Sequence, residues 1–355
     1  MSFTPSPLRF GIIGLGMIAE FHAQALAQVQ GAQLTAVATR DAAKGQAFAA
    51  RHGVAFAGTS VEDLVRRDDV DAICITTSAG AHLEPARVAA QAGKHLVVEK
   101  PLEINLERTD ALLEAAESAG VQVGAIFQSR FGDGARTVKR ALHTGRLGRM
   151  VLASAAVKWH RNADYYRGTR GQLRVDGGGA LLNQAIHAVD LLQWFAGLPT
   201  EVFCWTTRRV HTQIETEDTA VGTLRFADGA FGSIEASTAI WPGWQRRIEL
   251  CGESGSIALE DDRITRWDFR DAQPEDEGIR AGGAAAALGS GASAPNAISV
   301  LGHQRQLQDF VNAVREGRPV ELGGREARKA VALVCAMYAS AKSGRAESVS
   351  AGQSS

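Results

Sequence analysis

The chain has 355 residues, a formal net charge of −1 at pH 7 and 45% hydrophobic residues. This length predicts two domains, each with enough apolar residues for a core of its own. The near-neutral charge, without any block of Lys and Arg, argues against a nucleic-acid partner. The N-terminus lacks a basic segment followed by an apolar one, and no run of about 18 apolar residues occurs, so we expect a cytoplasmic protein that does not enter a membrane.

The four cysteines point to reduced thiols rather than to disulfides or a metal centre. They lie far apart in the sequence, and none has metal-ligand spacing: Cys74, Cys204, Cys251 and Cys335. We therefore predict no bound metal.

The first informative stretch is a glycine pattern near the N-terminus. An apolar run ends at Gly14-Leu15-Gly16, and helical periodicity starts at Met17. Gly14 would permit a tight turn, and Gly16 would let a phosphate approach the backbone. The free N–H groups at the helix start, including those of Met17 and Ile18, would then bind a pyrophosphate. Glycines at this spacing are weak evidence alone, but their place between a strand and a helix favours a dinucleotide fold.

Apolar strands and helices alternate up to residue 127. We expect strands at 34–39, 71–77, 95–98 and 121–127, with helices at 41–51, 60–67, 82–92 and 105–119. Ser60 and Asp63 resemble a capping box at the start of the second of these helices. The alternation predicts a doubly wound parallel sheet over residues 1–127, as in an NAD(P)-binding Rossmann domain.

Ligands of such a sheet bind outside the carboxyl ends of its strands. We therefore expect cofactor contacts from the residues that follow the strands: Thr39, Arg40, Thr76, Thr77, His82, Glu99 and Lys100. A charged pair between a buried strand and Pro101 is not what packing alone favours, which makes Lys100 a site candidate. A solvated strand end is the alternative interpretation.

The pattern of apolar and polar residues changes in the second half of the chain. Longer alternating runs predict antiparallel strands at 150–159, 201–207, 218–226, 231–240, 246–251 and 257–260, with hairpin signals at 227–229 and 252–255. Residues 281–294, rich in Gly, Ala and Ser, predict a mobile loop, and helices are expected at 303–316 and 325–343. We therefore predict an α+β domain over residues 128–355 with a large, mostly antiparallel sheet. Apolar residues occur at both alternating sets of strand positions, so that both faces of the sheet would be apolar. This predicts a homodimer or homotetramer.

A glycine run at 177–179 precedes a second candidate site. From Leu181 the periodicity is helical, which places Asn183, His187 and Asp190 on one face. A solvated helix face, or a core histidine satisfied by Asp190, would explain this pattern. The same spacing suits a general base with positioning partners.

Three patterns together resemble the Gfo/Idh/MocA oxidoreductase family. They are the glycine loop from Gly14 to Ala19, Glu99-Lys100-Pro101, and the glycine run followed by Asn183, His187 and Asp190. The resemblance covers nearly the whole chain and implies that Lys100 and His187 are catalytic. Asn183 stands where many relatives carry an aspartate. Because an amide cannot take up a proton, we assign Asn183 to hydrogen bonding.

Within that family, residues 158–166, Arg170-Gly171 and Asp176 are similar to a branch that includes dehydrogenases of nucleotide-linked aminouronic sugars. This similarity implies substrate contacts from Arg161, Tyr165, Tyr166 and Arg170, together with Lys100, Asn183 and His187. Packing of the loop is the alternative role for the first four. Thr169 stands where that branch usually carries a tryptophan, so we expect the sugar pocket to differ at this point.

The end of the second strand bears on the choice of cofactor. Thr39-Arg40 offers no carboxylate to the ribose hydroxyls, and Arg40 could pair with a 2′-phosphate. Within NAD(P) this slightly favours NADP, although Asp41 could bind the ribose instead.

The sequence thus predicts an NAD(P)-dependent oxidoreductase that transfers a hydride between nicotinamide and a secondary alcohol or ketone of a sugar, cyclitol or nucleotide-sugar. His187 would be the general acid or base, and Lys100 would stabilise charge on the reacting oxygen. One alternative is a cofactor-binding regulator without turnover, which the retention of Lys100 and His187 disfavours. Another is a dehydrogenase or reductase of a non-sugar substrate, such as a dihydrodiol or an imine.

Overall fold

The computed structural model describes residues 6–282 and 299–352, which fall into two compact units. Unit 1 comprises Met1–Gln128 and Val300–Arg328, and unit 2 comprises Ser129–Ser299 and Lys329–Ser355. The predicted loop at 281–294 lies outside the described residues except for its first two positions. None of the described helices is both long enough and apolar enough to cross a membrane.

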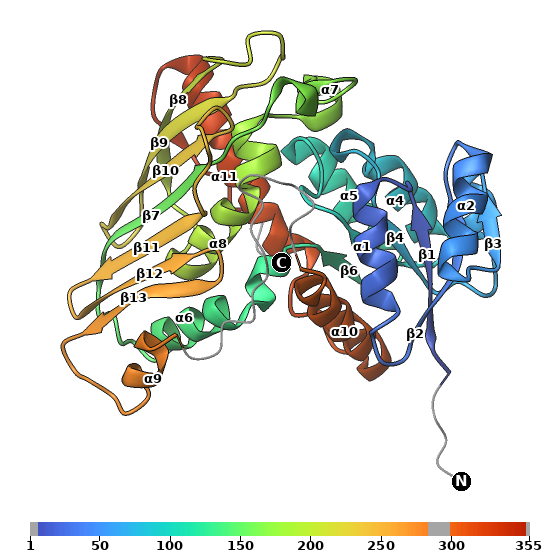
Figure 1. The fold of residues 1–355 in the computed structure, drawn as a ribbon, viewed down its shortest axis with the longest axis horizontal. Helices are drawn as coiled ribbons and strands as arrows, with labels where there is room; N and C mark the ends of the chain where they lie inside the picture. Colours follow the sequence, from blue (N-terminus) through green and yellow to red (C-terminus); the bar gives the residue numbers. More distant parts are fainter. Residues whose placement is uncertain (1–5, 283–298, 353–355) are drawn as a thin grey trace. The chain divides into compact units, whose positions relative to one another are not determined.

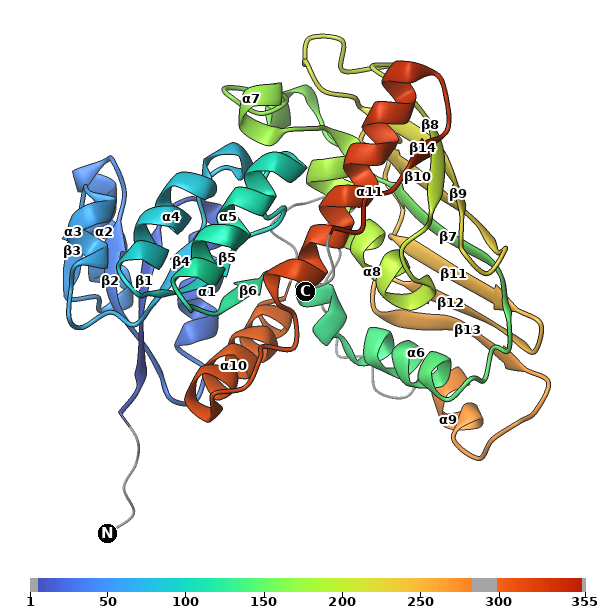
Figure 2. The ribbon, with the colours of Figure 1, turned by 180° about the vertical axis from the view of Figure 1, so that it is seen from behind.

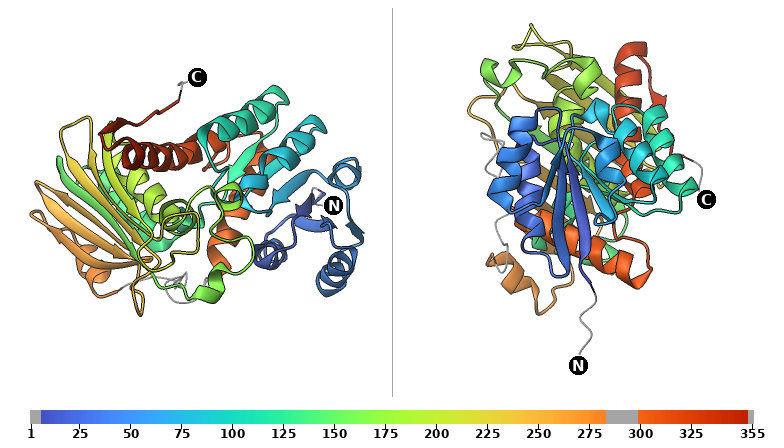
Figure 3. Two further views of the ribbon diagram at one scale, coloured as in Figure 1. Left: turned by 90° about the horizontal axis from the view of Figure 1, so that it is seen from above. Right: turned by 90° about the vertical axis from the view of Figure 1, so that its right-hand side faces the viewer.

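Unit 1 contains a six-stranded parallel sheet of order β3-β2-β1-β4-β5-β6, with helices on both faces (Figures 1 and 3). Its strands are β1 (Leu8–Ile13), β2 (Ala32–Ala38), β3 (Phe56–Gly58), β4 (Ala72–Ile75), β5 (His95–Val98) and β6 (Val123–Ala125). The intervening helices are α1 (Met17–Leu26), α2 (Ala42–His52), α3 (Val61–Val65), α4 (Leu83–Gln91) and α5 (Leu106–Ser118). This confirms the predicted doubly wound sheet. β3 was not predicted, because three residues are too few to show a period.

Side-chain caps mark where α2 and α3 of unit 1 begin. Ser60 accepts the Asp63 N–H at 3.2 Å at the start of α3, as the sequence predicts. Asp41 caps α2 in the same way, by accepting the Lys44 N–H at 3.0 Å. Such caps satisfy N–H groups that have no partner inside the helix.

Helix α10 (Leu301–Glu316) belongs to unit 1, whereas the sequence interpretation placed all of 128–355 in the second domain. Phe310 and Val311 are buried in the same core as Phe10, and the Phe10 and Phe310 rings lie 6.1 Å apart. Gln306 also donates to the Ala125 carbonyl at the end of β6, at 2.6 Å. The apolar stripe of α10 predicts a helix, but periodicity cannot tell which of two cores the helix covers.

Unit 2 is built on an eight-stranded sheet of order β13-β12-β11-β7-β10-β9-β8-β14 (Figure 2). Its strands are β7 (Met150–Lys158), β8 (Glu201–Thr207), β9 (Thr219–Arg225), β10 (Phe231–Ser237), β11 (Arg247–Gly252), β12 (Gly255–Glu260), β13 (Arg263–Phe269) and β14 (Glu347–Ser348). The helices are α6 (Asp133–His143), α7 (Leu173–Asp176), α8 (Ile186–Ala196), α9 (Asp276–Arg280) and α11 (Gly324–Ser343), which begins among the residues of unit 1. The mostly antiparallel sheet is confirmed.

One pairing in this sheet is parallel, contrary to the antiparallel strands that we expected. β7 and β10 run in the same direction, with Phe231 beside Leu152 and Ser237 beside Lys158. Alternation of apolar and polar residues reports which face is buried but not the direction of the neighbouring strand. Sequence patterning therefore could not have identified this pair.

The two faces of the eight-stranded sheet differ. α8 packs against β7 and β11, and α6 against β12, on one face, while none of the described helices covers the other (Figures 1 and 3). We call this other side the open face. It carries large apolar side chains among polar ones, including Leu152, Phe203, Trp205, Val221 and Phe231. Trp205 is 63% exposed and Phe231 is 57% exposed.

Candidate functional site

The glycine loop joins β1 to α1 and leaves space for a ligand. Gly14 has φ +90°, and a Cβ there would lie 2.8 Å from the Thr77 backbone nitrogen, so only glycine fits. The Gly16 N–H donates to the Gly14 carbonyl at 3.0 Å and closes the turn. A Cβ on Gly16 would meet no atom within 4 Å, and Met17, the first residue of α1, is 45% exposed. The loop therefore fits a phosphate held against the start of α1.

The ends of four strands lie side by side at this edge of the sheet. Ile13 is in register with Ala38 on one side and with Ile75 on the other, and Ile75 is in register with Val98. The residues that follow these strand ends include most of the predicted cofactor contacts. This edge is where ligands of open α/β sheets bind.

Three of the predicted contact residues use their side chains to shape this edge. Thr76 donates to the Gly14 carbonyl at 2.6 Å, and Thr77 donates to the Ala81 carbonyl at 2.7 Å. His82 is buried, and its two ring nitrogens lie 3.0 Å from the Pro101 carbonyl and 3.2 Å from the Thr77 carbonyl. These side chains fix the loops after β4 and β5.

The end of β2 presents one exposed cation. Arg40 is exposed and Thr39 is half-buried. Asp41, the alternative ribose ligand in the sequence interpretation, uses its carboxylate to cap α2. The side chain that extends from this strand end is therefore basic.

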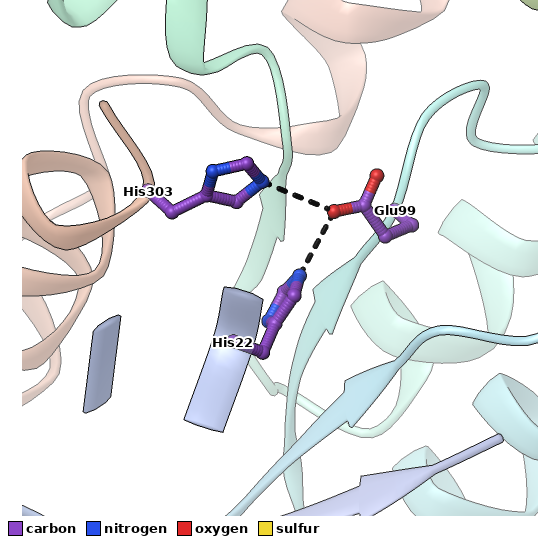
Figure 4. Close-up of side chains that lie close together, drawn as sticks. All are labelled: His22, Glu99 and His303. Atoms are coloured by element: carbon purple, nitrogen blue, oxygen red, sulfur yellow. Dashed lines mark hydrogen bonds and ion pairs between the residues drawn. The ribbon is translucent and has the colours of Figure 1, made fainter. Parts of the chain in front are cut away.

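Glu99 and Lys100 follow β5 but differ in environment. Lys100 is half-buried, whereas Glu99 is buried and its carboxylate accepts the Lys100 N–H at 3.1 Å. His22 of α1 and His303 of α10 also contact the Glu99 carboxylate, at 2.8 and 3.5 Å (Figure 4). Burial alone would raise the pKa of Glu99, but the bonds and charge of the two histidines outweigh it and hold the pKa well below its ordinary value.

The sequence interpretation missed both histidines. Each lies on the buried side of an amphipathic helix, where a lone histidine has many structural explanations. The only signal available in the sequence was a histidine at one of the apolar positions of each predicted helix.

In unit 2, the helix with the second candidate site begins irregularly. Residues Ala180–Ala185 form a π-helical segment that continues directly into α8, where we expected a regular helix from Leu181. Asn183 and His187 are half-buried on this helix, while Leu182 and Ile186 are buried. π-Helical turns often occur at functional sites because they re-aim side chains relative to a regular helix.

Glu217 holds the start of this helix and was also missed. Its carboxylate accepts the N–H groups of Gly179 and Leu181, at 2.9 and 2.8 Å, and the Tyr338 hydroxyl at 2.9 Å. Burial raises the pKa of Glu217, and these hydrogen bonds only partly offset it. A Cβ at Gly179 would lie 1.8 Å from the Glu217 carbonyl oxygen, which explains the glycine.

Asp190 does not lie on an exposed polar face, contrary to our expectation. It is fully buried, and its two carboxylate oxygens accept hydrogen bonds from Arg130 at 2.7 and 2.6 Å. The i, i+7 spacing relates Asn183 to Asp190, and the π-helical segment that holds Asn183 changes this relation from that of a regular helix. We therefore assign Asp190 to a buried ion pair with Arg130.

Four of the predicted substrate residues of unit 2 lie together in the structure. The Arg161 and Arg170 guanidinium groups lie 5.4 and 4.2 Å from the centre of the Tyr165 ring. The Tyr165 and Tyr166 rings meet edge to face at 5.0 Å, and burial raises the pKa of Tyr166 to about 12. Burial also lowers the pKa of Arg161, and the charge of Arg170 acts in the same direction. We call these four residues the Tyr165 cluster.

Gln184 links the Tyr165 cluster to the helix that carries Asn183 and His187. Its side-chain oxygen accepts a hydrogen bond from Arg161 at 2.9 Å, and its NH₂ group donates to the Tyr165 hydroxyl at 2.7 Å. The sequence interpretation did not select this residue. Its position, adjacent to Asn183 on a buried face, was the available signal.

The fold and this strand-end site define a dinucleotide-binding protein with a second polar site in unit 2. Residues 8–127 match the family described as "Oxidoreductase family, NAD-binding Rossmann fold", and residues 135–258 match the "GFO/IDH/MocA C-terminal domain". The chain therefore belongs to the Gfo/Idh/MocA family of oxidoreductases.

Similar proteins include dehydrogenases and a reductase of polyols and sugars. The myo-inositol 2-dehydrogenase of Thermotoga maritima is 28% identical over 337 residues, which cover 92% of this chain and 94% of that protein. The 1,5-anhydro-D-fructose reductase of Ensifer adhaerens is 30% identical over 70% of this chain and 74% of its own. The WlbA dehydrogenase of Bordetella pertussis, solved in complex with NADH and UDP-GlcNAcA, has a TM-score of 0.87 and 31% identity, covering 97% of this chain and 99% of its own.

Proposed function

We propose that this protein transfers a hydride between a nicotinamide cofactor and a secondary alcohol or ketone of an anionic sugar, with nucleotide-linked sugar acids as the favoured class. The observation that carries this proposal is the Tyr165 cluster, where two guanidinium groups flank one tyrosine ring. Paired arginines suit carboxylate and phosphate oxygens, which a neutral cyclitol lacks. The similarity to a dehydrogenase solved with NADH and UDP-GlcNAcA supports the same class.

The proposed roles of the catalytic residues follow from their chemistry. When bound, the nicotinamide group supplies or accepts the hydride. Lys100, at the strand end beside the cofactor edge, would stabilise the negative charge that develops on the reacting oxygen. His187 would take the hydroxyl proton in oxidation and return it in reduction. Asn183, one turn before His187, would hold the substrate by hydrogen bonds because an amide cannot exchange the proton.

We further infer a slight preference for NADP over NAD. Arg40 is exposed at the end of β2, and Asp41 beside it already caps α2. A guanidinium group suits the 2′-phosphate that distinguishes NADP.

We also propose that two or four copies assemble through the open face. Its large exposed side chains, Trp205 and Phe231 among them, are costly to leave in water. Polar residues such as Thr223 and Ser233 lie between them, as in many interfaces. The cytoplasmic location expected from the sequence stays a prediction.

The proposed substrate class predicts a charge preference. With wild-type protein, nicotinamide absorbance should change fastest with a UDP-linked N-acetylglucosaminuronate, more slowly with UDP-N-acetylglucosamine, and slowest with myo-inositol. Arg170→Ala should raise KM for the uronate about tenfold while changing kcat little, because the lost contact binds ground state and transition state alike. Arg167→Ala, which removes an exposed arginine three residues away, is the matched control. Equal activity on the charged and neutral sugars would contradict the proposed class.

The catalytic roles predict distinct defects for Lys100 and His187. Lys100→Met should slow hydride transfer about a thousandfold with cofactor affinity little changed, because the stabilisation is needed mainly in the transition state. His187→Ala should remove the acid limb of the pH–rate profile for oxidation, since a protonated base cannot accept the proton. The exposed Lys342→Met and His143→Ala serve as controls. Retention of the limb in His187→Ala together with its loss in Lys100→Met would reverse the two roles.

The NADP preference is tested by calorimetry on Arg40→Ala. The Kd for NADP should rise about tenfold, because a charge-assisted contact to the 2′-phosphate is lost, while the Kd for NAD stays within about twofold. If the affinities for NADP and NAD fall equally, Arg40 does not contact the 2′-phosphate.

The assembly is tested by light scattering at micromolar concentration. Wild-type protein should show the mass of two or four chains, and Phe231→Glu should shift it toward one chain because a carboxylate would be buried unpaired. Val210→Glu changes another exposed apolar residue of unit 2 that lies outside the open face, and it should leave the mass unchanged. A wild-type monomer would refute the proposal.

A further inference from the structure

A buried group of ionisable side chains lies directly beneath Lys100 in unit 1. His22, Glu99 and His303 come from α1, from the end of β5 and from α10, and Figure 4 shows both imidazole rings turned toward the Glu99 carboxylate. Both histidines are fully buried and Glu99 is 5% exposed. We call these three residues the Glu99 clasp. The residue that follows Glu99 is the proposed catalytic lysine.

The carboxylate of Glu99 has a different partner on each oxygen. Oε1 faces the two histidines, with the His22 Nε2 at 2.8 Å and the His303 Nε2 at 3.5 Å. Oε2 accepts the Lys100 backbone N–H at 3.1 Å. One oxygen is therefore hydrogen-bonded to His22 of α1 and lies beside His303 of α10, and the other holds the backbone of Lys100.

The charge state of the clasp follows from its burial. The histidine contacts keep the pKa of Glu99 low, so the carboxylate is ionised and only accepts hydrogen bonds. Burial lowers the pKa of His22, and because an ionised carboxylate can only accept, the His22 Nε2 is the donor in this contact. A charge-assisted bond of this kind is short and directional, as the 2.8 Å separation indicates.

We propose that Glu99 is a positioning residue that fixes the Lys100 backbone, and that His22 and His303 hold Glu99 in the position this requires. The inference rests on the proposed catalytic role of Lys100. The clasp also joins β5 to α1, whose start forms the phosphate loop, so the lysine backbone and the cofactor loop would share one rigid support. Catalytic groups need such support, because small displacements cost large factors in rate.

The same three ligand atoms lie within 4.8 Å of one another, which is close enough for a metal ion. The 2.8 Å separation between the His22 nitrogen and the Glu99 oxygen is an ordinary hydrogen-bond length. Oε2 is already engaged by the Lys100 N–H. These observations favour a hydrogen bond between His22 and Glu99 over a bound metal ion. The metal content of the purified protein is therefore measured as part of the test.

The test is a double-mutant cycle on Glu99 and Lys100. Glu99→Gln should lower kcat about thirtyfold while KM for substrate and Kd for cofactor stay within about twofold, because the loss acts through the position of Lys100. In a Lys100→Met background the same substitution should change kcat by less than about threefold, because the lysine amino group that Glu99 positions is already absent. Equal effects in both backgrounds would mean that Glu99 only supports the fold, which overturns the proposal.

Glu103→Gln is the matched control. Glu103 is also a buried carboxylate near the end of β5, but it accepts the N–H groups of Leu83 and Ile104 and bonds to Arg108. This substitution should lower stability to a similar extent, yet its effect on kcat should not depend on Lys100. Coupling of Glu103 to Lys100 as strong as that of Glu99 would overturn the proposal.

Hydrogen exchange gives a readout that does not depend on catalysis. In Glu99→Gln, exchange of the Lys100 amide should rise at least about tenfold, because its acceptor is weakened and the strand end opens more often. If Lys100→Met retains activity, the proposed function fails, while the exchange result still decides whether the clasp holds the backbone. Unchanged exchange overturns the proposal.

The histidines provide a second route if Glu99→Gln folds poorly. His22→Leu removes the donor to Glu99 and should reproduce both the loss in kcat and the faster exchange of the Lys100 amide. His22→Gln retains an N–H donor and should recover most of the activity. Equal defects in the two variants would overturn the proposal. One equivalent of zinc in the purified wild-type protein, and none in Glu99→Gln, would also overturn the proposal, because the cluster would then be a metal site.

Discussion

The register of the parallel strands in unit 1 is the constraint on which the cofactor edge depends. Hydrogen bonds between β2, β1, β4 and β5 place Ala38, Ile13, Ile75 and Val98 in neighbouring positions, so the residues after them come to one edge of the sheet. Gly14 and Lys100 are far apart in sequence, yet both leave the sheet at this level. Because a slip by one residue would turn each side chain to the opposite face, the register also decides which side chains face a ligand.

Buried carboxylates repeatedly hold backbone N–H groups in this protein. Glu99 does so for Lys100, Glu217 for Gly179 and Leu181, and Asp218 for three consecutive residues, Arg209 to His211. Removing a carboxylate from water is costly, and charge-assisted hydrogen bonds offset that cost only when their geometry is good. Each such carboxylate therefore fixes one segment of backbone. Two of the three are at the segments that carry the proposed catalytic residues.

The Tyr165 cluster is the feature on which the proposed substrate class rests. Its two arginines and the neighbouring Gln184 place positive charge and hydrogen-bond donors around one aromatic ring. Thr169, beside Arg170, is exposed. Substrate choice in this fold would therefore lie in the loop between β7 and α8, while the sheet edges supply the shared chemistry.

The sequence by itself determined the order of the elements, the doubly wound first sheet, the mostly antiparallel second sheet and the segments that carry the candidate site. Those features depend on local properties: periodicity, glycine where φ must be positive, and polar residues at strand ends. Only the tertiary structure decided that α10 joins unit 1, that β7 runs parallel to β10, and that Asp190 pairs with Arg130. It also revealed the partners of Glu99 and Glu217, which come from residues more than 70 and more than 30 positions away. Such contacts depend on which surfaces meet in space, and no local pattern encodes the identity of a distant partner.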